Sequence, residues 1–183
     1  MGGIASKGQL RMSFLRWAVV TVPLILLLGF AAGSAVPVGD ENRWYAALVK
    51  PAANPPNWAF PVAWTTLYIL LGLAVALVLH ARGARGRGLA LLLFAAQFAL
   101  NLAWTPVFFG MHQVGAALWI IIAMLVLAIA ATLAFGRIRT LAAWLMVPYL
   151  VWISFAGVLT WRIGQINPGA ETLDPTSRTS QML

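Results

Sequence analysis

Side chains that could carry acid–base, nucleophilic or metal chemistry are few in this sequence of 183 residues, and they lie far apart. The four carboxylates belong to Asp40, Glu41, Glu171 and Asp174. The two histidines, His80 and His112, are too widely separated to share a metal ion, and cysteine is absent. The sequence therefore excludes a thiolate metal site and a cysteine nucleophile, and it offers no carboxylate pair for acid–base catalysis. We expect neither a metal site nor a required cofactor.

Aromatic side chains at helical spacing are the signal that remains, since nine of the residues are tryptophan. Residues three or four apart lie on the same face of a helix, and three such faces occur. They comprise Phe60, Trp64 and Tyr68; Gln97, Asn101, Trp104 and Phe108; and Trp144, Pro148 and Trp152, with Phe155 and Ala156 one turn further on. Aromatic faces that carry two amide groups are typical of a concave, apolar pocket for a small molecule.

Ordinary packing is the alternative explanation of this pattern. Trp and Tyr also gather at membrane interfaces, a role that fits Trp44, Trp58 and Trp161. On spacing alone, a pocket and plain packing account equally well for the tryptophans within the three faces. Gln97 and Asn101 favour the pocket, because an amide in hydrocarbon is costly unless it is paired or faces a cavity.

Composition places these faces in a membrane protein. Hydrophobic residues make up 62% of the chain and charged residues 9%, whereas a soluble domain has about 45–50% and about 25%. This excludes an ordinary soluble enzyme and a disordered chain. The net charge of +8 is spread between long apolar runs, so it indicates membrane orientation and not nucleic-acid binding.

Apolar run lengths predict the number of spans. The stretches without a charged residue are 17–39, 51–81, 88–136 and 140–161. A span needs about 20 apolar residues, so the third stretch must turn back, at the polar, glycine-containing segment 110–115. We predict an all-α integral membrane bundle of five spans, at about 14–36, 60–81, 89–109, 114–135 and 141–162.

The segments outside the spans differ in character. Residues 1–13 are predicted to form an N-terminal extension, and residues 168–183 a flexible tail. The connection 37–57 is too long for a simple turn, and its prolines break any continuous helix. Because it contains the pair Trp44-Tyr45, we expect an ordered lid that packs over the bundle.

The distribution of Lys and Arg predicts the orientation. With five spans, the N-terminus shares one side of the membrane with the second and fourth connections. That side carries basic residues and no acidic residue: Lys7, Arg11, Arg16, Arg82, Arg85, Arg87, Arg137 and Arg139. We therefore expect a multi-pass protein of the bacterial cell membrane with a cytoplasmic N-terminus; an outer-membrane location stays open.

A cleaved signal peptide is an alternative for the first 35 residues. A basic start and an apolar run lead to the small-residue segment Gly33-Ser34-Ala35. Cleavage there would leave four spans. The apolar run is long for a signal peptide, which favours a retained first span.

Three ordered sequence blocks closely resemble the TspO family, the tryptophan-rich sensory proteins related to the mitochondrial translocator protein. The first block runs from Trp44 to Tyr68 and contains Asn54-Pro55-Pro56-Asn57-Trp58. The others are Gln97 to Gly110, with Asn101-Leu102-Ala103-Trp104-Thr105-Pro106, and Pro148 to Ala156, with Pro148-Tyr149-Leu150-Val151-Trp152. The resemblance covers about residues 15–167.

The resemblance implies a five-helix membrane bundle, often dimeric, that binds porphyrins in a pocket between helices under the first loop. By matching position, it implies a lining of Trp64, Tyr68, Gln97, Asn101, Trp104, Trp152 and Ala156, with Trp44 and Tyr45 in the lid. Trp161 stands where the family usually has Tyr, so the sterol-recognition pattern at the end of the fifth span is incomplete, and we do not expect sterol binding.

Function is open between three classes at this point. The first is a receptor or sensor that binds a protoporphyrin-like tetrapyrrole and regulates or moves it. The second is an enzyme that degrades porphyrin in light, with Trp64 and Trp152 as the candidate reactive residues. The third is a transporter of small apolar ligands. We favour the first, because a planar, apolar porphyrin suits an aromatic pocket and can stack on tryptophan rings. The second is compatible with the sequence, which has no other catalytic apparatus.

Small residues predict where helices meet. Ala95, Ala99 and Ala103 form a stripe along the third span, separate from the face with the amides. This stripe is expected to meet the same span of a second subunit in a homodimer. The intrachain alternative is contact with Ala130 and Ala134 of the fourth span.

Overall fold

The computed structural model describes residues 7–173, and in that range every regular element is helical. The long helices are α1 Lys7–Ser34, α3 Ala59–His80, α4 Arg87–Thr105, α5 Val114–Ile138 and α6 Thr140–Ile166. Helix α4 continues into a turn of π-helix, η2 Pro106–Gly110. Short elements occupy the connection after α1, namely η1 Gly39–Glu41 and α2 Arg43–Ala47, and the C-terminal turn η3 Ala170–Thr172. Five helices in the described range are long and apolar enough to cross a membrane, which confirms the predicted fold class.

Helix bounds differ from the expected spans mainly at the ends. The segment 1–13 is not all extension, because α1 begins at Lys7. Helix α5 reaches Ile138 and α6 runs from Thr140 to Ile166. Charged residues end an apolar run but not a helix, because Lys and Arg are good helix formers. Hydropathy therefore locates a span better than it locates helix ends.

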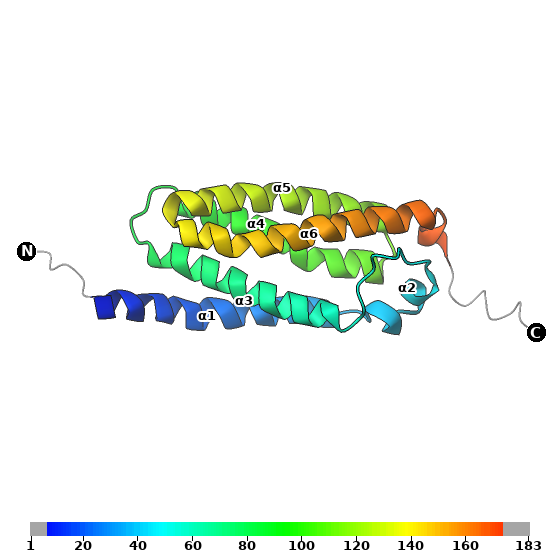
Figure 1. Cartoon of the computed structure of the whole chain (residues 1–183), viewed down its shortest axis with the longest axis horizontal. Helices are drawn as coiled ribbons and strands as arrows, with labels where there is room; N and C mark the ends of the chain where they lie inside the picture. The colour runs from blue at the N-terminus through cyan, green and yellow to red at the C-terminus, as the bar shows by residue number, and fades with distance from the viewer. Residues whose placement is uncertain (1–6, 174–183) are drawn as a thin grey trace, which may run out of the picture.

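The five long helices form a ring in which chain neighbours are not always spatial neighbours. Helix α1 packs on α3, α3 on α6, α6 on α5 and α5 on α4, and a smaller contact between α4 and α1 closes the ring. Figure 1 shows α2 at the same end of the bundle as the C-terminal end of α6. We call this end, where the connection 35–58 lies, the lid end.

The α1–α3 contact depends on small residues. A Cβ atom on Gly72 of α3 would lie 2.6 Å from the Cα atom of Val22 in α1, so the two backbones are in close contact there. The Thr21 hydroxyl donates a hydrogen bond to the Gly72 carbonyl oxygen at 2.8 Å. Gly29 lies against the ring of Tyr68. These contacts make α1 part of the packed bundle. Cleavage after residue 35 would remove all of them.

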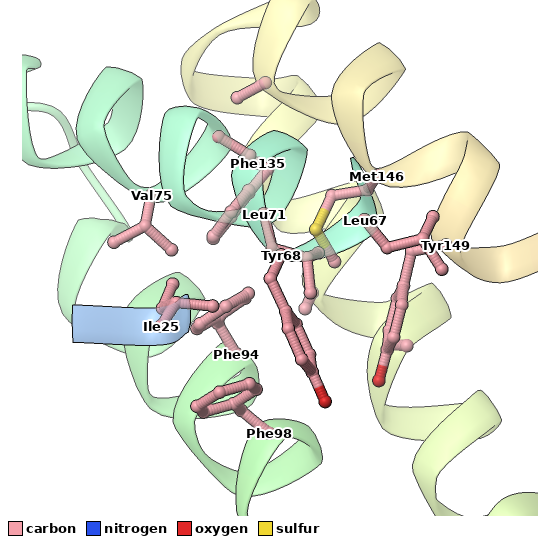
Figure 2. Close-up of a cluster of buried hydrophobic side chains, with 14 of the residues drawn as sticks. Ile25, Leu67, Tyr68, Leu71, Val75, Phe94, Phe98, Phe135, Met146 and Tyr149 are labelled. Carbon is pink, nitrogen blue, oxygen red and sulfur yellow. The ribbon is translucent and has the colours of Figure 1, made fainter. Parts of the chain in front are cut away.

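Buried side chains form two clusters. The larger one fills the middle of the bundle and includes Tyr68, Phe94, Phe135 and Tyr149. Figure 2 shows the rings of Tyr68 and Tyr149 projecting in the same direction from α3 and α6. The second cluster lies at the lid end and is centred on Trp44 and aromatic residues of η2.

Orientation in the membrane can be tested with single cysteines, since the chain has none of its own. Gly86 is a poor site because its φ is +77°, but Gly88 has helical geometry and open space around it. We expect Gly88→Cys to react with a membrane-impermeant maleimide only from the cytoplasm. Gln113→Cys, at the lid end, should react only from outside. The reverse labelling pattern would contradict the orientation predicted from the basic residues.

Candidate functional site

Aromatic rings from α3 and α6 meet at the predicted site. The Trp64 ring lies 5.3 Å from the Tyr68 ring and 6.3 Å from the Trp152 ring, measured between centroids. The Phe60 and Trp152 rings are 6.1 Å apart. These edge-to-face and tilted arrangements are favourable for aromatic pairs. The rings contact one another, so they form one aromatic cluster that joins α3 to α6.

Each of the two amides on α4 is paired with a tyrosine from another helix. The Tyr68 hydroxyl donates to Asn101 Oδ1 at 3.1 Å, and the Tyr149 hydroxyl donates to Gln97 Oε1 at 2.7 Å. Both bonds are buried. Because they join α4 to α3 and to α6, they fix the amides in position within an otherwise apolar interior.

Tyr149 is the site residue that the sequence analysis missed. It lies one position after Pro148 and is fully buried. Its spacing of four residues from Ile153, also fully buried, places both on the inner face of α6. The sequence pattern instead indicated the neighbouring face of α6, which carries Trp144, Pro148 and Trp152. Trp144 on that face is exposed. A buried amide on α4 needs a donor or acceptor from another helix, and that requirement signals that a partner exists without identifying it as Tyr149.

Two buried N–H donors on α4 have no partner in the described part of the chain. They are Nε2 of Gln97 and Nε1 of Trp104. These residues are seven positions apart, close to two helical turns, so both lie on one face of α4. An unsatisfied buried donor costs about 1–3 kcal/mol. Such groups are typical of a site that receives hydrogen-bond acceptors from a ligand or a water molecule.

The lid is an ordered structure anchored to η2. The Asn42 side chain caps α2 by accepting a hydrogen bond from the Tyr45 backbone N–H. Its Nδ2 group donates to the carbonyl oxygen of Pro37 within the lid and to that of Phe109 in η2, both at 2.9 Å. Trp44 and Tyr45 are therefore held under the lid surface, where they are 1% and 4% exposed.

The C-terminal turn holds the other side of the lid. Trp44 Nε1 donates to the Ala170 carbonyl oxygen at 2.7 Å. The Asn167 side chain accepts from the Val49 backbone N–H and donates to its carbonyl oxygen, both at 2.9 Å. Ala170 is 3% exposed. The segment 168–172, which was predicted to be part of a flexible tail, leads into η3 and is held at the lid through the Ala170 carbonyl oxygen. Residues 174–183 lie outside the described range.

The lid tryptophan is separated from the α3–α6 rings. Trp44 packs edge-on against Phe108 at 5.4 Å, and Phe108 stacks on Trp104 at 4.9 Å. Trp44 and Tyr45 belong to the cluster at the lid end, whereas Trp104 packs against both clusters. The structure thus brings together Trp64, Tyr68, Gln97, Asn101, Trp104 and Trp152, and it places Trp44 and Tyr45 in a layer above them. Ala156 packs against the central cluster as a partly buried residue.

Comparison with known proteins agrees with this architecture. The sequence profile of the TspO/MBR family matches residues 20–166. The chain is 40% identical to the tryptophan-rich protein TspO of Chlorobaculum tepidum over 148 residues, which are 80% of this chain and 93% of that protein. It is 40% identical to the tryptophan-rich sensory protein of Cereibacter sphaeroides, over 78% of this chain and 91% of that protein. It is also 38% identical to the translocator protein of Bos taurus, over 79% of this chain and 86% of that protein.

Proposed function

The chain belongs to the TspO/MBR family of membrane sensor and translocator proteins, and on that premise we propose that it binds a porphyrin of the protoporphyrin type between α3, α4 and α6. In this proposal the protein acts as a receptor that senses or moves the tetrapyrrole. The ligand lies against the rings of Trp64 and Trp152, under the layer formed by the lid.

The two unpartnered donors are the observation that carries the proposal. Gln97 is 0% exposed, and its Nε2 group and Nε1 of Trp104 are buried without a partner in the described residues. A ligand that satisfies them must present acceptor atoms and must also cover the aromatic surface beside them. A porphyrin combines a large planar π-surface with carboxylate oxygens, so it meets both requirements.

A titration of the purified protein tests this proposal directly. Protoporphyrin IX added to the protein in detergent or nanodiscs should quench tryptophan fluorescence with saturation at one equivalent per chain. Haem titrated in parallel measures whether the metal-free ring is preferred. Quenching that rises linearly without saturation would show partition into the lipid phase and would contradict a site.

Photo-oxidation is a second candidate function, favoured by one specific observation. Two electron-rich indole rings, of Trp64 and Trp152, lie edge-on at 6.3 Å in the proposed site. Light absorbed by a bound porphyrin could oxidise them in the presence of oxygen. Illumination separates the two functions: consumption of porphyrin well beyond one equivalent indicates an enzyme, whereas bleaching that stops at one equivalent indicates a binding protein.

The homodimer is also a proposal, and the small-residue stripe on α4 supports it. Ala95 and Ala99 are exposed on the single chain, and Ala103 is partly buried. Helix α4 meets α5 through Phe94, whose ring stacks on that of Phe135, while Ala95 and Ala99 stay exposed, so the intrachain alternative through Ala130 and Ala134 is not favoured. Close approach of such a stripe is a common way for helices to pair in lipid.

Enlarging the stripe should therefore separate the subunits. We expect Ala99→Phe to shift detergent-purified protein from dimer to monomer in light scattering, with porphyrin affinity unchanged. Leu133→Phe, at an exposed position on α5, is the matched control and should leave the dimer intact. A dimeric Ala99→Phe protein would place the interface elsewhere.

A further inference from the structure

A hollow on the outer surface of the bundle lies directly behind the proposed site. It is an open groove between α3 and α6 with a volume of about 500 Å³. Its lining is Ala63, Thr66, Leu67, Pro148, Val151, Trp152 and Phe155. The Thr66 hydroxyl donates to the Val62 carbonyl oxygen of its own helix, so the groove presents an almost entirely apolar surface.

Trp152 connects this groove with the interior. Trp152 lines the groove. Its ring also contacts the rings of Phe60 and Trp64 on α3. Phe155, one turn further along α6, lines the groove too, and its ring lies 6.0 Å from that of Trp152. Both side chains are only partly buried. A single layer of aromatic rings thus separates the groove from the proposed site.

The lid offers a more obstructed route. A molecule that came from the aqueous side would have to break the Asn42–Phe109 and Trp44–Ala170 hydrogen bonds and the paired bonds between Asn167 and Val49. It would then have to displace Phe108, which is 1% exposed and stacked on Trp104. At the α3–α6 groove the partly buried Trp152 ring forms no side-chain hydrogen bond within the described residues, so its displacement breaks none.

The groove also lies within the membrane-spanning stretches of α3 and α6. Val151 is close to the middle of α6, and Ala63 to Leu67 lie between one and two and a half turns from the lid-end terminus of α3. An apolar, planar molecule dissolved in the bilayer therefore reaches this surface without leaving lipid. Charged or strongly polar solutes do not reach it by this route, because they are costly to place in hydrocarbon.

From these observations we propose that the α3–α6 groove is the entrance through which the planar apolar ligand passes from the bilayer to the site, with Trp152 as the movable partition. This inference rests on the proposed porphyrin binding. It assigns the lid a role in closing the top of the site and not in admitting the ligand. The rate of binding is then set at the groove, while the equilibrium affinity is set inside.

Filling the groove tests the entrance. Val151 is 65% exposed, so Val151→Trp adds a ring over the groove without entering the core. Stopped-flow quenching of the nanodisc-embedded protein by protoporphyrin IX should show association and dissociation slowed by about tenfold or more, with Kd unchanged, because a barrier on the path affects both directions equally. Leu133→Trp, equally exposed on α5, should keep wild-type rates.

Locking the lid with a disulfide tests the alternative route, in which the ligand enters past the lid. In the cysteine-free chain, Val49→Cys combined with Asn167→Cys places two thiols where backbone and side chain are already hydrogen-bonded. The oxidised, disulfide-locked protein should bind protoporphyrin IX at the rate of its reduced form. Slow or absent binding in the locked form would overturn the groove as the entrance.

The remaining outcomes distinguish failure of the groove as an entrance from failure of porphyrin binding itself. Unchanged rates in Val151→Trp, with normal Kd, would mean that lipid chains alone occupy the groove, and would overturn the entrance while leaving porphyrin binding in place. A weaker Kd without slower association would make the groove the binding site itself and would also overturn it. Absence of saturable quenching in the wild-type protein would overturn the proposed function and, with it, the entrance.

Discussion

Replacing Gly72 by leucine should disrupt the packing of α1 against α3. The added Cβ would lie 2.6 Å from Val22 Cα and 3.0 Å from its backbone nitrogen, so α1 must move away as a whole. The hydrogen bond from Thr21 to the Gly72 carbonyl oxygen would be lost with that movement. Overpacking costs about 1–3 kcal/mol, and the lost buried hydrogen bond adds about 1 kcal/mol. The midpoint of thermal unfolding in detergent should fall by about 6–12 °C.

Gly33→Leu is the matched control, since nothing lies within 4 Å of a Cβ atom at that position on α1. It carries the same change in side chain and helix propensity but meets no neighbour. Its unfolding midpoint should stay within a few degrees of the wild type. Equal midpoints for the two variants would mean that α1 is not packed against α3 as described.

Trp64→Ala and Trp152→Ala should each weaken protoporphyrin IX binding by about 1–3 kcal/mol, which is roughly a 5- to 150-fold rise in Kd. Each substitution removes one of the rings on which the ligand is proposed to lie. The two rings are in contact at 6.3 Å, so the effects of the two substitutions should not add in the double variant. Fluorescence titration of the remaining tryptophans gives the affinities.

Controls for these variants come from tryptophans on the lipid-facing surface. Trp119 and Trp144 are 72% and 67% exposed. Trp119→Ala and Trp144→Ala remove the same number of atoms at positions away from the proposed site. Their Kd values should match the wild type. If all four variants lost affinity equally, binding would depend on the total tryptophan content of the membrane surface and not on this site.

Run length and spacing predict the bundle well for a physical reason. Hydrocarbon admits only backbones whose polar groups are satisfied internally, so long apolar runs must become helices. The same constraint makes Gln97 and Asn101 informative, because an amide within a span needs a partner. Its partner could not be derived, since Tyr149 and Gln97 are 52 positions apart and only the ring order of the helices brings them together.

Contacts at the lid end were beyond sequence reasoning for a related reason. The Trp44–Ala170 hydrogen bond joins residues 126 positions apart and uses a backbone carbonyl, which carries no sequence signature. Residues 168–172 contain a proline, a glycine and two polar residues, a composition typical of a solvated tail. The Gly72 contact with Val22 was likewise invisible, because a glycine within an apolar run gives no indication of which helix approaches it.

Site-resolved oxidation is the measurement that tests the central claim most directly. The protein is saturated with protoporphyrin IX in nanodiscs, illuminated briefly in air, digested and analysed by mass spectrometry for oxidised tryptophan. A porphyrin bound between α3, α4 and α6 should oxidise Trp64 and Trp152 first, although Trp119 and Trp144 are far more exposed. Oxidation that follows exposure, with Trp119 and Trp144 modified before Trp64 and Trp152, would contradict the site.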